Sequence, residues 1–399
     1  MSGYKPSATT HFVNSEWEAK QLIPALTKQL EADAKNAALL CNLGNSYYTT
    51  GETERAIELF REAHLLAPDN AAICCNLGIA LADHVKFDEA YGYVEKANRL
   101  DPTDRYAASV YAEFLLRNGQ WAMGWDLYER CRFSIPDCPL PKYTGGSLQG
   151  ARILVLQEGG SGDVFMAFRF FKNLREMAPD KITFAVDKQL HCVFENHPWV
   201  DNLIEADGVK ILLSDYDCYV SSFSLTPIFA HTPDRVPWPG AYLKGEVDVK
   251  RIVGNKLKVG LCWMAGEWDE NRPHRTLSEK NLDMLLTNIL IRENVKWYSL
   301  QKDWPTPSGM EQLNLETWET TAEEIDALDL VISVDTGVMH LAGAVGKPVW
   351  TLLSNSCWRF LREGEACVWY PTMRLFRNRE KGYDQAVEKA AEELRRLKV

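Results

Sequence analysis

The stretch SVDTGVMHLAGAVGKPVW, residues 333–350, changes its pattern three times and decides the fold of the larger part of the chain. An apolar run ends at Val334, an Asp-Thr-Gly turn follows, and residues 338–345 then form an apolar segment of helical length. Gly346 is placed to end this helix, and a second apolar run begins at Val349. The order strand, helix, strand predicts a parallel βαβ unit.

The same alternation continues on both sides of this stretch. Strands are expected at Ile153–Leu156, Ile182–Val186, Asn202–Glu205, Cys218–Val220, Val259–Trp263, Val295–Gln301, Leu330–Val334 and Val349–Leu353. Helices are expected at Asp163–Met177, Glu279–Ile291, Ala322–Leu328, Val338–Val345 and Asp384–Leu397. Pro237–Gly240 separates two such series, which predicts two Rossmann-like halves, residues 151–240 and 241–399, facing a ligand-binding cleft.

The first third of the chain repeats itself with a period of 34 residues. Asn42-Leu43-Gly44 recurs as Asn76-Leu77-Gly78, and the same step relates Ala56 to Ala90, Ala63 to Ala97, and Pro68 to Pro102 and Pro136. This period, with its early Leu-Gly, its small residue and its closing proline, resembles the tetratricopeptide repeat (TPR). We therefore expect a helical solenoid over residues 16–136, with about three repeats from residue 37 and a leading helix at Glu16–Ala34. A flexible terminus (residues 1–15) would precede it, and a linker (residues 137–150) would follow.

Two roles for these repeats stay open. A stack of repeats forms a concave surface, which would bind a peptide or protein partner. A short stack also serves as a scaffold that braces the next domain. The sequence favours neither.

Composition excludes several classes of function. The net charge is −11, whereas nucleic-acid binding needs a basic face, so no nucleic-acid partner is expected. The ten cysteines form no C-x-x-C pair and are expected to be reduced thiols in a reducing compartment. No apolar run approaches the roughly 18 residues of a membrane span, and the polar N-terminus lacks a signal core. A cytoplasmic location without a membrane span is expected.

The turn within residues 333–350 carries the first chemical signal. Thr336 can cap the helix, and Gly337 permits close backbone approach, so the free N–H groups of the helix N-terminus can bind a diphosphate. His340 shares this face. Alternatively, this is a capped structural helix with a satisfied histidine. The whole stretch resembles the nucleotide-sugar motif of glycosyltransferase family 9, the heptosyltransferase-like family. That resemblance implies a GT-B fold, inversion at the transferred sugar, and donor contacts from Asp335, Thr336, Gly337 and His340.

A second turn, Glu158–Asp163, follows the first strand of this region. It has neither the Gly-Lys-Ser/Thr of a Walker A loop nor the third glycine of a dinucleotide fingerprint. It resembles the Gly-Asp turn of the same family, which implies that Asp163 is the base on the acceptor hydroxyl and places Gly160 and Gly162 beside the donor. The alternative is that Asp163 only caps a helix.

A third signal follows the strand at Val259–Trp263. The resemblance implies that Arg275, after a loop that also carries Arg272 and His274, contacts the donor diphosphate, with Trp263 beside it. A solvated basic loop is the alternative, and for Arg272 it is preferred. Gln301, at a strand end, is expected beside the base or ribose. Residues 369–377 match a segment of repeat-fused relatives and receive no role.

The leading hypothesis is an inverting glycosyltransferase that needs no metal and no cofactor. It would move a sugar from a nucleotide sugar to a protein or glycan hydroxyl, with the repeats binding the acceptor or a partner. Asp215-Tyr216-Asp217 is not interpreted as a metal site. The first alternative is a module that binds a nucleotide sugar without turnover. A scaffold that has lost its ligand is the second.

Overall fold

The computed structural model describes residues 15–132, 138–206, 213–243, 256–266, 275–354, 357–379 and 382–397. These residues form two compact units. The first holds the described residues up to Arg132 together with Cys357–Arg359, and the second holds the remainder. Within the first unit, the ring of Trp358 packs edge-to-face against Trp125 at 5.3 Å between centroids.

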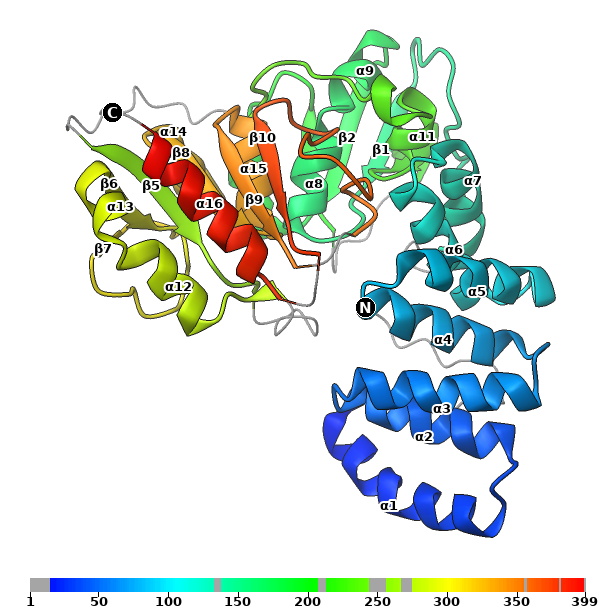
Figure 1. Ribbon diagram of the computed structural model, residues 1–399. Helices are drawn as coiled ribbons and strands as arrows, with labels where there is room; N and C mark the ends of the chain where they lie inside the picture. Colours follow the sequence, from blue (N-terminus) through cyan, green and yellow to red (C-terminus); the bar gives the residue numbers. More distant parts are fainter. Residues whose placement is uncertain are drawn as a thin grey trace. The chain divides into compact units, whose positions relative to one another are not determined.

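The first unit is a stack of helical hairpins, as the 34-residue period predicts (Figure 1). Within residues 15–132 its helices are α1 (Glu16–Ala32), α2 (Ala37–Thr49), α3 (Thr53–Leu66), α4 (Ala71–Asp83), α5 (Phe87–Leu100), α6 (Arg105–Arg117) and α7 (Trp121–Cys131). Helices α2 and α3, α4 and α5, and α6 and α7 form three hairpins, and α1 packs against α2. The three repeats and the leading helix are confirmed.

Repeated residues explain where these helices begin and how closely they pack. Asn36, Asn70 and Asp104, each 34 residues from the last, cap α2, α4 and α6 with side-chain oxygens that accept helix N–H groups. A Cβ atom on Gly44 would lie 2.6 Å from the Phe60 ring, and one on Gly78 would lie 2.5 Å from Val94 Cγ1. The repeated glycine is therefore needed for the two helices of a hairpin to touch.

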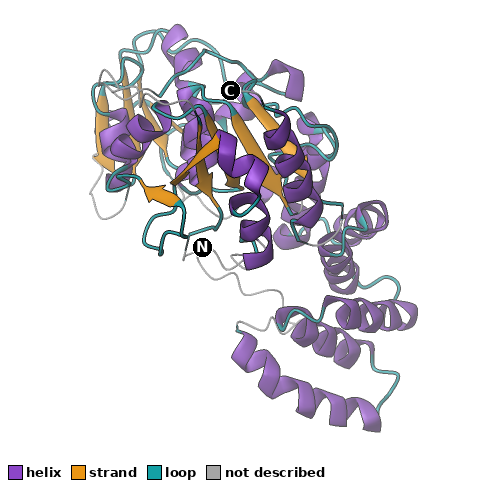
Figure 2. Cartoon of the chain, turned by 60° about the vertical axis from the view of Figure 1, so that its left-hand side comes forward, coloured by secondary structure: helices purple, strands orange, loops and turns teal. Residues whose placement is uncertain are grey.

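The second unit contains two parallel sheets (Figure 2). The first sheet has the order β3-β2-β1-β4. Its strands are β1 (Arg152–Leu156), β2 (Lys181–Val186), β3 (Asn202–Glu205) and β4 (Cys218–Ser221). The second has the order β10-β9-β8-β5-β6-β7. Its strands are β5 (Leu257–Cys262), β6 (Val295–Ser299), β7 (Met310–Gln312), β8 (Leu330–Val334), β9 (Val349–Leu353) and β10 (Met373–Arg377).

Helices pack around these sheets (Figures 1 and 2). They are α8 (Ser161–Phe168), α9 (Phe171–Glu176), α10 (His191–Phe194), α11 (Leu225–Phe229), α12 (Glu279–Leu286), α13 (Ile289–Asn294), α14 (Trp318–Asp326), α15 (Gly337–Val345) and α16 (Asp384–Arg396). The predicted helical repeat followed by a parallel α/β fold is thus confirmed.

Some boundaries differ from the prediction. The helix expected at residues 163–177 is broken at Arg169, whose buried side chain bonds back to Met166 O. The helix expected at residues 279–291 is broken at Asn288, whose side chain accepts from Leu290 N–H and so begins α13. The stretch expected as a linker lies along the first sheet in part, because Tyr143 N–H donates to Tyr219 O.

Each sheet places one pair of strand ends where ligands bind in open α/β folds. In the first sheet the chain runs from β1 outward to β3 and returns to β4 on the other side of β1. In the second sheet it runs from β5 outward to β7 and returns to β8 on the other side of β5. The carboxyl ends of β1 and β4, and of β5 and β8, are therefore the topological switch points. The turns that follow β1, β5 and β8 hold most of the residues singled out from the sequence.

All ten cysteines are free thiols, as expected, and Cys41, Cys74, Cys75, Cys131, Cys262 and Cys367 are buried. In the part of the chain that the structure describes, no helix is both long and apolar enough to cross a bilayer.

Candidate functional site

The turn after β8 leaves the N-terminus of α15 without a side-chain cap from its own N-cap residue. Thr336 occupies the N-cap position in extended geometry, but its side chain makes no capping bond. Its hydroxyl lies 3.1 Å from Ser333 Oγ and 3.7 Å from Cys262 Sγ instead. The prediction that Thr336 caps α15 is wrong in this respect, because these two buried groups attract its hydroxyl. The predicted helix stop at Gly346 is confirmed, with the left-handed φ of 86° that favours glycine.

Arg275 is held beside this turn by main-chain pairing. Ala265 N–H donates to Arg275 O at 3.0 Å, and Leu277 N–H donates to Trp263 O at 2.9 Å. The guanidinium donates to the main-chain oxygen of Asp335 and lies 3.8 Å from its carboxylate. Its side chain is 33% exposed, so part of the charge reaches solvent. The structure thus brings two predicted residues together at the β5/β8 switch point, whereas Arg272 and His274 lie outside the described residues.

Gln301 and Trp263 support this arrangement from inside. Gln301 Oε1 accepts from Met264 N–H at 3.1 Å and from the Cys262 thiol at 3.6 Å. Burial raises the pKa of Cys262, so the thiol stays protonated and able to donate. The ring of Trp263 is buried in the hydrophobic core of the second sheet. Gln301 therefore fixes the turn after β5, and the indole of Trp263 is part of the scaffold.

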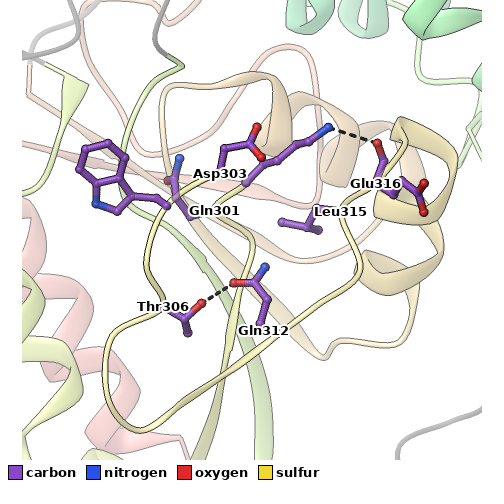
Figure 3. Close-up of a pocket in the computed structure, with 8 residues that line it drawn as sticks. Gln301, Asp303, Thr306, Gln312, Leu315 and Glu316 are labelled. Carbon is purple, nitrogen blue, oxygen red and sulfur yellow. Dashed lines mark hydrogen bonds between the residues drawn. The ribbon is translucent and has the colours of Figure 1, made fainter.

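A hollow of about 460 Å³ opens at the carboxyl end of β6 (Figure 3). It is lined by Gln301, Lys302, Asp303, Trp304, Thr306, Gln312, Leu315 and Glu316. Lys302 Nζ donates to Glu316 O at 3.1 Å, and the Thr306 hydroxyl donates to the Gln312 amide oxygen. Trp304 remains 45% exposed, which is unusual for so large a ring. Apart from Gln301, these residues were not predicted from the sequence, although an aromatic residue just after a strand end was an available signal.

The turn after β1 places Asp163 near the start of α8. Asp163 Oδ2 accepts from Gly160 N–H at 3.0 Å. Gly159 has a φ of 80°, and a Cβ atom there would lie 2.8 Å from the Asp163 carboxyl carbon. Glu158, just before, is buried and accepts from the Ser221 hydroxyl. Gly160, and not Asp163, is the N-cap of α8, so the alternative that Asp163 is the N-cap is wrong as stated. Asp163 occupies the third position of the helix and stabilises the turn through its bond from Gly160 N–H, which also fixes the position of its carboxylate.

Helices α8 and α15 bring the two halves together. A Cβ atom on Gly162 would lie 2.8 Å from His340 Cδ2 and 3.2 Å from Gly337 Cα. Nearby, the rings of Phe165 in α8 and Trp318 in α14 meet edge-to-face at 5.1 Å. The predicted acceptor-side turn and donor-side turn are thus direct neighbours.

His340 lies at this contact and is buried. Its Nδ1 atom is 3.1 Å from the hydroxyl of Tyr370, a residue to which the sequence analysis gave no role. Since Gly162 packs on the Cδ2 edge of the same ring, His340 faces the junction of α8 and α15, on the side expected from its spacing to Thr336.

The Asp215-Tyr216-Asp217 stretch serves another purpose. Asp217 forms an ion pair with Arg152, with Oδ1 3.0 Å from Nη2, and this hydrogen bonding lowers the pKa of Asp217 to about 2. No group of three or more His, Cys, Asp or Glu residues that could hold a metal ion occurs among the described residues.

Comparison with known proteins adds two family matches. Residues 37–70 match the tetratricopeptide repeat, and residues 313–390 match glycosyltransferase family 9 (heptosyltransferase). The second match covers β8, α15 and β9 and so includes Asp335, Thr336, Gly337 and His340. Protein FlbA of Caulobacter vibrioides is 27% identical over 410 aligned residues, which cover 91% of this chain and 67% of FlbA.

Two solved structures are similar at lower identity. A glycosyl transferase family 9 protein from Veillonella parvula is 14% identical, with a TM-score of 0.44 over 63% of this chain and 99% of its own. The ADP-heptose LPS heptosyltransferase II of E. coli is 17% identical, with a TM-score of 0.42 over 61% of this chain and 97% of its own.

Proposed function

We propose that the chain is an inverting glycosyltransferase. The proposal starts from the tetratricopeptide repeats and from the match of residues 313–390 to glycosyltransferase family 9. The donor is a nucleotide sugar, and the acceptor is a hydroxyl of a protein or glycan. The single observation that carries this proposal is the direct contact between the Asp163 turn and the Thr336-Gly337 turn across Gly162. It supports the proposal because the turn that carries the Asp163 carboxylate and the helix end proposed to bind the diphosphate are neighbours.

The donor diphosphate binds at the N-terminus of α15. The helix end offers N–H groups and a partial positive charge, and the Thr336 side chain does not occupy them. Arg275 adds a full positive charge at the same edge, and its bond to Asp335 O sets its position. These two sources of positive charge offset the charge that develops on the leaving diphosphate, so the proposed reaction needs neither a metal nor a cofactor.

The nucleoside lies in the hollow at the carboxyl end of β6. The exposed ring of Trp304 provides a surface for a base, and the amides of Gln301 and Gln312 provide polar contacts. Gln301 also bonds to Met264 N–H at the end of β5, which links this hollow to the diphosphate site.

The chemical step is a single displacement. The acceptor oxygen attacks the anomeric carbon while the bond from that carbon to the diphosphate oxygen breaks, so the configuration inverts. The hydroxyl proton passes to the Asp163 carboxylate, and the nucleoside diphosphate leaves with the bonding electron pair. A carboxylate accepts more than one hydrogen bond, so the bond from Gly160 N–H orients Asp163 without preventing proton transfer.

The repeats bind the acceptor or a partner protein. Support for this role comes from the three stacked hairpins and from the tetratricopeptide match, since such stacks bind peptides on their concave face.

A second candidate is a domain that binds a nucleotide sugar without transferring it. It is favoured by the hydrogen bond from Gly160 N–H, which gives Asp163 a structural role of its own. Asp163→Asn separates the two candidates, because the amide oxygen can keep this bond while the base is lost.

In the experiment, the protein is incubated with a panel of nucleotide sugars that carry a label in the sugar. The rate at which the labelled sugar is transferred to macromolecules or to water is measured. The proposal predicts that Asp163→Asn lowers the rate by about 100-fold or more while donor affinity stays within about twofold. Asp217→Asn, which precedes β4 at the amino end of the parallel strands and so lies away from the Asp163 turn at their carboxyl end, is the control and retains activity. Transfer by Asp163→Asn at the wild-type rate would show that Asp163 is not the base, and no turnover by the wild type with intact donor binding would favour the second candidate.

A further inference from the structure

We propose that Tyr370 is a positioning residue for His340, and that its hydroxyl sets the direction in which the imidazole faces the junction of α8 and α15. The inference rests on the proposed function in one respect only, namely that His340 contacts the donor. Tyr370 lies near the C-terminus, just before β10, and so reaches α15 from a distant part of the sequence.

The contact between the two side chains is specific. Tyr370 is fully buried, and its hydroxyl lies 3.1 Å from His340 Nδ1. Its ring rests on α15 at Gly343, where a Cβ atom would lie 2.6 Å from the ring carbons. Glycine at this position is therefore required for Tyr370 to approach the helix.

A buried cation also lies over the tyrosine ring. The Arg169 guanidinium lies 4.6 Å from the centroid of the Tyr370 ring and 5.4 Å from that of Tyr242. Arg169 donates to Met166 O at 2.8 Å, to the Tyr242 hydroxyl at 3.1 Å, and to Trp369 O. The Tyr242 hydroxyl in turn donates to Phe165 O at 2.9 Å. Tyr370 is thus held by Arg169, which is itself bonded to α8 through Met166 O, to the Tyr242 hydroxyl and to Trp369 O.

This arrangement orients the imidazole. Burial is the main cause that raises the pKa of Tyr370 well above its usual value, so its hydroxyl stays neutral. A hydrogen bond at Nδ1 restricts rotation of the ring, and Gly162 packs on its Cδ2 edge. Because Nε2 is bonded to Cδ2, this nitrogen lies on the side of the junction where the diphosphate is proposed to bind. A histidine is positioned by the partner of its other nitrogen in the same way at many sites.

The first test is a double-mutant cycle on nucleotide binding. Tyr370→Phe keeps the ring and removes the hydroxyl, and isothermal titration with ADP, GDP and UDP reports the Kd. For the nucleotide that the wild type binds, we expect Tyr370→Phe to raise Kd by about 3- to 10-fold. In a His340→Ala background the same change should leave Kd unaltered, because the effect passes through His340. An unchanged Kd, or an equal rise in both backgrounds, would overturn the inference.

The second test does not depend on a ligand. In protein labelled with 15N-histidine, the ring signals absent from His340→Ala identify His340. Tyr370→Phe should shift these signals, whereas Tyr143→Phe, which removes another buried hydroxyl bonded to Gly146 O, should not. If the His340 signals stay in place in Tyr370→Phe, the inference is overturned, whether or not the protein binds a nucleotide. If the signals shift but no nucleotide binds, the contact between Tyr370 and His340 is supported and the proposed function fails.

Discussion

Gly162 and Gly337 lie so close that a Cβ atom on Gly162 would stand 3.2 Å from the Cα atom of Gly337. The two residues come from the turns that end the first strand of one sheet and the central β8 of the other. Glycine at position 162 is therefore a condition for α8 and α15 to meet, and with them the two turns proposed to act on one substrate.

Replacing this glycine should destabilise the second unit. In Gly162→Ala the new methyl group would also lie 2.8 Å from His340 Cδ2, and such overpacking costs about 1–3 kcal/mol. Urea unfolding followed by tryptophan fluorescence measures this loss. Gly160→Ala, in the same turn, would meet nothing within 4 Å and is the matched control for stability. Equal unfolding free energies for the two variants would contradict the packing described here.

A second matched pair tests the helical unit. Gly78→Ala would place a methyl group 2.5 Å from Val94 Cγ1 and should lower the melting temperature of this unit. Gly92→Ala, inside α5, meets nothing within 4 Å, and alanine is favoured over glycine in a helix by about 1 kcal/mol. Circular dichroism melting should therefore show opposite shifts. A destabilised Gly92→Ala would mean that this face of α5 is covered.

The hollow at β6 leads to a prediction about affinity. Trp304→Ala should weaken binding of the preferred nucleoside diphosphate by about tenfold, because it removes the exposed ring expected to stack on the base. Titration calorimetry measures the Kd, and the unfolding free energy should change little. Trp17→Ala in α1 removes an indole that is 73% exposed and serves as the control. If both variants bind equally well, the base lies elsewhere.

His197 leads to a prediction about pH. Burial lowers the pKa of His197 below 6.5, although the hydrogen bond of its ring to Tyr242 O opposes this shift. The other ring nitrogen, Nδ1, accepts from Trp199 N–H at 3.3 Å. A depressed folded pKa means that its stabilising contribution is complete above pH 6.5 and is lost as the pH falls through the folded value. The wild type should therefore lose more stability between pH 7.5 and 5 than His197→Gln, with the exposed His231→Gln as control. Parallel pH profiles for all three proteins would refute this assignment.

Strands buried on both faces could be predicted from the sequence residue by residue. Leu330–Val334 and Val349–Leu353 are β8 and β9 with the expected bounds, and both are mainly apolar strands inside the second sheet. Asn202–Glu205 is β3 with the expected bounds as well, although it is a half-buried strand at the edge of the first sheet. The short and polar β7 and the Arg-containing β10 were missed, because strands at the edge of a sheet need fewer apolar residues.

The turns of the candidate site could also be predicted, but not the side chains that support them. Asp163, Thr336 and Gly337 follow strands in a pattern that local sequence reveals. The role of Arg169 and Tyr370 depends on a contact between residues about 200 positions apart in the sequence. No local sequence pattern identifies a buried arginine that packs among aromatic rings. The break in the helix at Arg169 escaped prediction for the same reason.

Thermal shift in the presence of EDTA measures whether Arg275 and the N-terminus of α15 bind a nucleoside diphosphate. ADP, GDP and UDP, each with a matching nucleotide sugar, are added to the wild type, to Arg275→Ala and to the control Arg374→Ala. A ligand at about 100 times its Kd stabilises the folded state by about 2.7 kcal/mol. We expect one nucleotide family to raise the melting temperature of the wild type and of Arg374→Ala, and we expect Arg275→Ala to lose this shift. No shift with any nucleotide, or an undiminished shift in Arg275→Ala, would contradict this expectation.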